Sequence, residues 1–205
     1  QLHGMLGEGK YESQTGTNVY RDFVELPSQL MENWATEKEF LDLWAVNYQT
    51  GEPIPAEIVE RIIAAQNYLA AYLNVRQLSF GLTDMAWHTL TEPFEGDVEQ
   101  FEAVSMAPTQ VLPVVSGTAM APAFGHIFSG GYAAGYYGYK WAEVLEADAF
   151  SLFKEKGIFN REAASSFREN VLAKGGTEHP MELYVRFRGH KPETRALIEK
   201  MGLGK

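Results

Sequence analysis

Apolar residues in this chain recur with the period of an α-helix, and no segment of useful length alternates apolar and polar residues as a strand does. The clearest stripe lies between residues 56 and 80 and contains Ile58, Ile62, Ala65, Leu69 and Leu73. This spacing is that of an amphipathic helix with a broad apolar face. It predicts one long helix over 56–80, buried within a larger helical body, with Gly81 as its stop.

Helical spacing covers most of the remaining chain as well. Further helices are expected over 1–6, 21–34, 37–47, 84–90, 97–104, 136–156, 161–174, 182–188 and 193–201. Asp97 and Asn160 are expected N-caps, because their side chains can accept from free amides of the first turn. The sequence therefore predicts a mainly α fold and a single helical domain over residues 1–205, without fixing its topology.

Composition excludes several classes of function. The net charge is −10, from 27 acidic residues against 17 lysines and arginines, which argues against a nucleic-acid partner. Because there is no cysteine, neither disulfides nor thiolate chemistry can operate. No apolar run approaches the roughly 20 residues that a membrane span needs. A water-soluble helical protein without a membrane or nucleic-acid partner is expected.

Residues 125–139, GHIFSGGYAAGYYGY, hold five glycines, four tyrosines and one histidine. Three interpretations of this segment are possible. A phosphate cradle is excluded, because no strand precedes the segment and neither GxGxxG nor GxxxxGK[ST] is present. Close helix packing is possible, since small residues let helices approach. The third interpretation is a mobile glycine hinge that carries phenols over a cleft.

Tyrosine spacing within this segment bears on the choice. Tyr132, Tyr136 and Tyr139 recur at helical spacing, yet each intervening glycine lowers helix stability by about 1 kcal/mol. Packing alone therefore explains the segment poorly. Phenols with an ordinary pKa of about 10 stay protonated at neutral pH and can donate to an oxyanion. The residues by themselves leave packing and the phenol-bearing lid equally open.

A polar stripe on the expected helix 21–34 also has two interpretations. Its members are Asp22, Glu25, Gln29 and Glu32, opposite an apolar face of Phe23, Leu26, Leu30 and Trp34. Such a stripe is either a solvated helix face or a set of carboxylates that ligate or orient a cation. No two of the five histidines lie within five residues, so no complete metal-binding histidine pair is present. His88 is expected to pack on a helix.

Two long motifs resemble the thimet oligopeptidase family of zinc metallopeptidases. They are GTNVYRDFVELPSQLMENW at 16–34 and FGHIFSGGYAAGYYGYKW at 124–141, and the likeness covers nearly the whole chain in order and spacing. GGYAAGYY and the following WAEVLEADAF are most similar to the bacterial peptidyl-dipeptidase (dipeptidyl carboxypeptidase) pattern. The resemblance implies a helical lobe of a two-lobed clamshell, here lacking the HEXXH helix.

The resemblance also implies roles for individual residues. Glu25 matches the third ligand of a single Zn²⁺ ion, and Asp22 and Glu32 match acids that orient the zinc ligands. Tyr139 and His126 match donors to the tetrahedral oxyanion. The substrate-binding residues of the glycine-rich loop are matched by Tyr132, Tyr136, Gly130 and Gly131. His3 matches no ligand.

The segment Gln1-Leu2-His3-Gly4 matches the residues that follow the family's HEFGH motif. The resemblance therefore implies that the chain is the C-terminal portion of a longer enzyme, whose N-terminal part is its necessary partner. The expected activity is zinc-dependent hydrolysis of short peptides in the cytoplasm, with release of C-terminal dipeptides and no activity in the isolated chain. The alternative is a non-catalytic helical module that binds peptides or serves a structural role.

Overall fold

The computed structural model describes residues 2–203, so Gln1, which the resemblance places just after the zinc motif, lies outside the described part. The regular structure of these residues is helical, apart from one isolated bridge between Val46 and Pro53. The mainly α prediction is confirmed. The chain divides into a first unit, made of the residues up to 68 and from 141 onward, and a second unit over 69–140. One domain over 1–205 stays a prediction.

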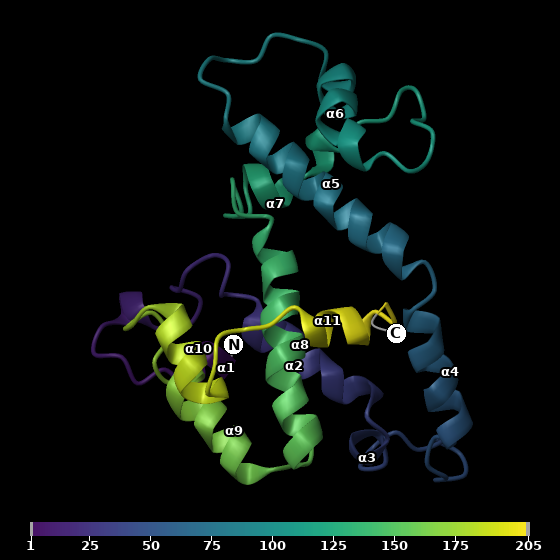
Figure 1. The fold of residues 1–205 in the computed structure, drawn as a ribbon, viewed down its shortest axis with the longest axis vertical. Helices are drawn as coiled ribbons and strands as arrows, with labels where there is room; N and C mark the ends of the chain where they lie inside the picture. The colour runs from purple at the N-terminus through teal and green to yellow at the C-terminus, as the bar shows by residue number, and fades with distance from the viewer. Residues whose placement is uncertain (1, 204–205) are drawn as a thin grey trace. The chain divides into compact units, whose positions relative to one another are not determined.

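The first unit is built around the long helix α8. Its helices are α1 (Leu2–Met5), η1 (Glu12–Gln14), α2 (Leu26–Glu32), η2 (Asn33–Thr36), α3 (Lys38–Leu41), α4 (Ala56–Gln66), α8 (Gly138–Lys156), α9 (Arg161–Phe167), η5 (Arg168–Leu172), α10 (Pro180–Arg188) and α11 (Arg195–Lys200). α2, α8, α9 and α10 share one core (Figure 1), in which Leu30, Leu145 and Tyr184 are almost completely buried. This core holds α2 in place, and α2 directly follows Glu25.

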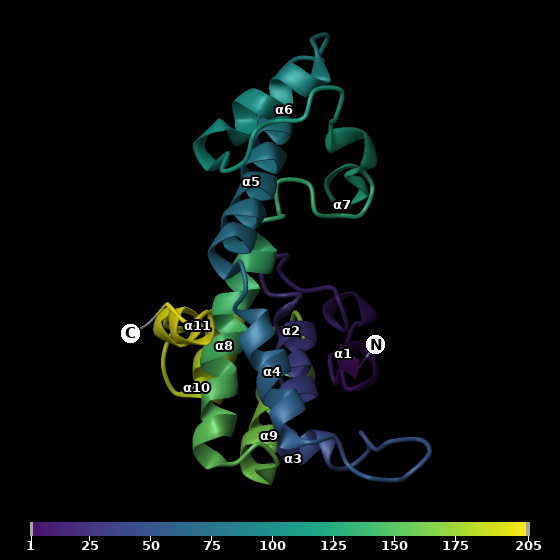
Figure 2. The same ribbon diagram turned by 90° about the vertical axis from the view of Figure 1, so that its right-hand side faces the viewer.

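The second unit places α6 against α5 (Figure 2). Its helices are α5 (Ala70–His88), α6 (Val98–Met106), η3 (Ala107–Thr109), η4 (Ala121–Ala123) and α7 (Gly125–Phe128), followed by the first turn of α8. Trp87 of α5 contacts Phe101 of α6, with ring centroids 4.2 Å apart. The buried Glu102 carboxylate accepts from the backbone amides of Met120 and Ala121. These contacts set the entry of the chain into α7.

The predicted single helix over 56–80 is wrong in two respects. α4 ends at Gln66 and α5 begins at Ala70, because Leu69 takes a left-handed conformation with φ of 57°. α5 then passes through Gly81 and continues to His88. Within the described residues the stripe is not covered, since Ile58, Ile62, Leu69 and Leu73 are 42–53% exposed, so its burial within a larger helical body stays a prediction.

Other helix boundaries were predicted with mixed success. The helix expected over 21–34 begins only at Leu26, with Pro27 in its first turn, so Asp22 lies in a preceding turn and Glu25 at the N-cap position. The helix expected over 37–47 is reduced to the short α3. The N-caps are confirmed: Asp97 accepts from the Gln100 amide at 3.0 Å and Asn160 from the Ala163 amide at 2.9 Å.

Candidate active site

Four aromatic side chains of residues 125–139 gather at one place in the second unit. The His126 ring lies 5.9 Å from Tyr132, 6.0 Å from Tyr136 and 6.1 Å from Tyr139, measured between centroids. Tyr132 and Tyr139 stack with centroids 4.9 Å apart, and Tyr136 lies 5.1 Å from Tyr139. His126 is exposed and the three tyrosines are half-buried. This phenol–imidazole cluster can therefore present several donors to a ligand.

The cluster depends on an irregular backbone, not on the helix suggested by the tyrosine spacing. α7 ends at Phe128 and α8 begins at Gly138, and the residues between them form turns. This path requires glycine at position 130, because a Cβ atom there would lie only 2.9 Å from the His126 Cα atom. Gly131 adopts φ of 81°, which a residue with a side chain rarely takes. The two glycines thus shape the turn between His126 and Tyr132.

Burial raises the pKa of Tyr136, and the neighbouring Tyr139 phenol raises it further, while Arg76 acts in the opposite direction. Since the ordinary value is already 10.0, the Tyr136 phenol is protonated at neutral pH. Its hydroxyl is therefore available as a hydrogen-bond donor. Phe80 and Phe124 pack edge-on against its ring, with centroids 5.8 and 5.0 Å away.

The carboxylates singled out in the sequence lie in the first unit and differ in exposure. Glu25 is half-buried, and its Oε2 accepts from the Ser28 hydroxyl at 2.7 Å. Asp22 is half-buried and lines a cavity of about 170 Å³ together with Tyr20 and His179. Glu32 is exposed on α2. Because Asp22 precedes the helix, the four polar residues do not form one helical stripe.

A zinc site is not complete within residues 2–203. No group of three or more His, Asp or Glu side chains in this part of the chain is placed to hold a metal ion. His3 is buried, and its Nε2 atom has no hydrogen-bond partner among the described residues. Burial also lowers the pKa of His3, which favours the neutral ring. The described residues therefore do not form a metal site by themselves.

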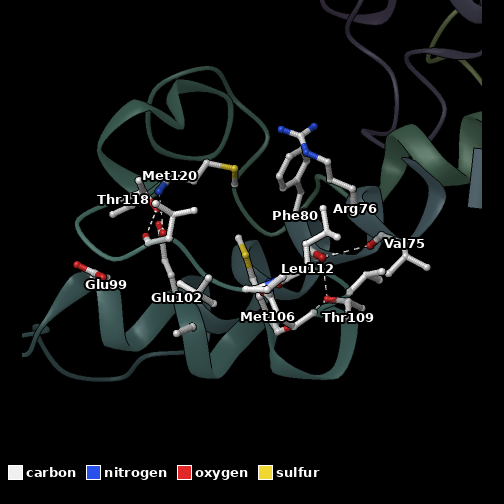
Figure 3. A pocket seen from close by; sticks show the side chains of 18 of the residues that line it. Val75, Arg76, Phe80, Glu99, Glu102, Met106, Thr109, Leu112, Thr118 and Met120 are labelled. Atoms are coloured by element: carbon white, nitrogen blue, oxygen red, sulfur yellow. Dashed lines mark hydrogen bonds between the residues drawn. The ribbon is translucent and has the colours of Figure 1, made fainter. Parts of the chain in front are cut away.

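A larger cavity of about 540 Å³ in the second unit shares Arg76 and Phe80 with the surroundings of Tyr136 (Figure 3). Arg76 and Phe80 line it from α5, and Met106 lines it from α6, with Leu112 from the connection that follows. The Arg76 guanidinium lies over the Phe80 ring, 4.5 Å from its centroid. The lining is largely apolar, and its charged groups are the Arg76 guanidinium and the Glu99 and Glu102 carboxylates.

Sequence reasoning missed Asp84, a completely buried residue of α5 that binds the backbone of the tyrosine segment. It also gave His88 only a packing role, whereas His88 contacts Asp84 as well. The available signal was an acid and a histidine four residues apart in α5, at Asp84 and His88. Such a pair lies on one helix face.

None of the helices among residues 2–203 is both long and apolar enough to cross a membrane. Phenol and imidazole donors gathered at one accessible place are suited to stabilising the oxyanion of acyl transfer, the reaction class of peptidases. Comparison with known proteins agrees with this class. A model of peptidase family M3 matches residues 1–203, and the chain belongs to that family.

Relatives of the chain include proteins named oligopeptidase A and dipeptidyl carboxypeptidase. Oligopeptidase A of Salmonella typhimurium is 48% identical over 205 residues, and that of Escherichia coli is 47% identical over 204. Dipeptidyl carboxypeptidase of Salmonella typhimurium is 38% identical over 204 residues. Each match covers 98% of this chain but only 30% of the relative. The chain thus spans about a third of the length of these relatives, and membership of the thimet oligopeptidase family is confirmed.

Proposed function

We propose that the full-length protein hydrolyses peptide bonds in short peptides and that this chain supplies the donors for the oxyanion. The observation that carries the proposal is the phenol–imidazole cluster, which lies in a chain that belongs to a peptidase family. In this proposal Tyr139 and His126 donate hydrogen bonds to the carbonyl oxygen as it gains charge. Tyr132 and Tyr136 contact the peptide, and Gly130 and Gly131 give the turn its shape.

Replacement of Tyr139 by phenylalanine tests the oxyanion role. Losing one such donor typically lowers kcat by about 100- to 1000-fold. In the full-length protein, Tyr139→Phe should therefore lower kcat strongly and leave KM and metal content nearly unchanged. Tyr137→Phe removes a phenol hydroxyl from another position of the same segment and serves as the matched control. An unchanged kcat in Tyr139→Phe would rule out the oxyanion role.

For the metal, we propose that Glu25 is the ligand that this chain contributes to a single Zn²⁺ site, and that Asp22 and Glu32 orient its surroundings. The half-buried Glu25 carboxylate, with its Ser28 donor, suits that role. Because one carboxylate cannot hold a catalytic zinc ion, residues 1–205 alone should not hydrolyse peptides. Turnover by the isolated chain after addition of zinc would contradict this assignment.

Specificity is the finer part of the proposal. The GGYAAGYY motif favours release of C-terminal dipeptides, whereas the higher identity is to proteins named oligopeptidase A. Product analysis on two peptides, one with a free and one with an amidated C-terminus, separates dipeptide release from internal cleavage. Failure of the full-length protein to cleave either peptide would favour a non-catalytic helical module. A cytoplasmic location is part of the same proposal.

A further inference from the structure

Asp84 lies in α5, and its side chain is completely buried beneath the turns that lead to the phenol–imidazole cluster. Its Oδ1 atom accepts from the backbone amide of Ala134 at 2.9 Å, and its Oδ2 atom accepts from the amide of Tyr136 at 2.8 Å. Residues 129–137 have no helical ladder of their own, so these amides need other acceptors. One carboxylate therefore holds two alternate amides of the segment.

His88 fixes the orientation of this carboxylate. Its Nδ1 atom lies 2.8 Å from Asp84 Oδ1 and 2.9 Å from the Asp84 carbonyl oxygen, one helical turn away. Because both neighbours are acceptors, Nδ1 carries the hydrogen and donates to them. The His88 ring also lies 5.9 Å from the ring of Phe128, at the end of α7. His88 thus restrains Asp84 from one side while the amides bind it from the other.

The backbone at Ala134 shows that the segment is held in an unfavourable conformation. Ala134 has φ of 52°, in the left-handed region that a residue with a Cβ atom takes only at a cost. The hydrogen bonds donated by the backbone amides of Ala134 and Tyr136 are both accepted by the Asp84 carboxylate. Hydrogen bonds to an ionised acceptor are stronger than neutral ones, so they can maintain such a conformation.

The restraint extends from Tyr136 to the catalytic candidates. The Tyr136 carbonyl accepts from the Tyr139 amide at 3.2 Å in the first turn of α8. The Tyr136 ring is in turn 6.0 Å from His126 and 5.1 Å from Tyr139. A shift of the Tyr136 backbone would therefore change the spacing of the donors around it.

We propose that Asp84, oriented by His88, is a positioning residue for the phenol–imidazole cluster. Asp84 holds the backbone of Ala134 and Tyr136, and in this way Tyr136, Tyr139 and His126 keep their mutual spacing. Asp84 lies beneath the backbone and acts through it, not on the substrate. This inference rests on the proposed peptidase function for its effect on catalysis. Its structural part, the restraint of residues 129–137, stands independently.

The experiment uses Asp84→Asn in the full-length protein. An asparagine amide keeps the shape of the side chain but offers one acceptor oxygen in place of two. One of the two hydrogen bonds from the Ala134 and Tyr136 amides is therefore lost, and the asparagine NH₂ group faces a backbone N–H group. Displacement of reacting groups by about 1 Å costs about 100-fold in rate. We expect kcat on a quenched fluorescent peptide to fall by about that factor, with KM little changed. Amide hydrogen exchange in residues 129–137 should become faster, with exchange in α6 unchanged.

Asp97→Asn is the matched control, because the Asp97 carboxylate also accepts a backbone amide in the second unit but lies at the start of α6. It should leave kcat and exchange in 129–137 at wild-type values. If Asp84→Asn does not fold, His88→Gln removes only the orienting ring and should give a smaller change of the same kind.

Three results would overturn the proposal. They are wild-type kcat and exchange in Asp84→Asn, an equal loss of kcat in Asp97→Asn, and a loss that vanishes after correction for the folded fraction. If wild-type protein cleaves no peptide, the proposed function fails, and hydrogen exchange in 129–137 still decides whether Asp84 restrains the segment. Faster exchange then supports the restraint, and unchanged exchange refutes it.

Discussion

Gly130 is the position at which a single methyl group should disturb the candidate active site most directly. A Cβ atom at residue 130 would lie 2.9 Å from the His126 Cα, 3.1 Å from the His126 carbonyl oxygen and 3.2 Å from the Gly125 carbonyl oxygen. These are backbone atoms, so no side-chain rotation relieves the contact. The closest approach is about 0.5 Å short of ordinary contact, and the turn has to open by about that distance.

The cost of Gly130→Ala follows from that displacement. Overpacking of this kind destabilises a protein by about 1–3 kcal/mol. Half an ångström at His126 should also lower kcat by about tenfold, since about 1 Å costs about 100-fold. Urea unfolding and peptide hydrolysis by the full-length protein measure the two effects. Wild-type values in both would refute the account of the turn.

Gly81→Ala provides a control with the opposite sign. Gly81 lies inside α5, and a Cβ atom there would meet nothing within 4 Å. Alanine in a helix interior is more favourable than glycine by about 0.5–1 kcal/mol. The free energy of unfolding should therefore rise in Gly81→Ala and fall in Gly130→Ala. A change of the same sign in both variants would show that local space does not decide the outcome.

Two further predictions concern the buried polar groups of the first unit. Tyr184→Phe should lower the free energy of unfolding, measured by urea denaturation, by about 1.5–3 kcal/mol, because the single hydrogen of the Tyr184 hydroxyl is shared between the Asp148 carboxylate at 2.5 Å and the Leu145 carbonyl at 3.0 Å. Equal stability would show that water replaces these bonds. For Glu146, burial raises the pKa above 4.5, although Lys200 and Asn33 oppose the shift and Glu143 adds to it. Its contribution to stability is therefore fully present below pH 4.5 and is lost as the pH rises through the higher folded pKa. The difference in unfolding free energy between wild type and Glu146→Gln should follow that loss, and a pH-independent difference would contradict it.

Some features of the fold could be predicted because their causes are local. Asp97 and Asn160 cap helices through amides three residues away, so sequence contains both partners. The break at Leu69 was missed because the apolar period continues across it, and periodicity does not report a single left-handed residue. Gly81 was misjudged as a stop because its cost of about 1 kcal/mol is small beside the contacts of a long helix.

In the candidate site, too, local features could be predicted from the sequence and long-range contacts could not. Tyrosine spacing drew attention to Tyr132, Tyr136 and Tyr139, whose rings lie close together although the backbone that joins them is not helical. Asp84 escaped notice because its backbone partners lie 50 and 52 residues further along the chain. A contact over that separation follows only from the packing of α5 against the turn. Sequence thus indicates which groups gather, and the tertiary contacts determine what holds them.

Glycine content in 125–139 suggested a mobile hinge, but the hydrogen bonds assign the glycines a different first role. Gly130 and Gly135 donate to Gly125 and Tyr132 carbonyls at 2.7 and 2.8 Å, and Gly138 donates to the Gly135 carbonyl at 3.0 Å. Gly130 also allows a close backbone approach that no other residue permits. The glycines therefore specify a shape. A motion of residues 129–137 relative to α5 would have to break the bonds to Asp84, so it should be slower, and the amides of the segment better protected, than in a free glycine-rich loop.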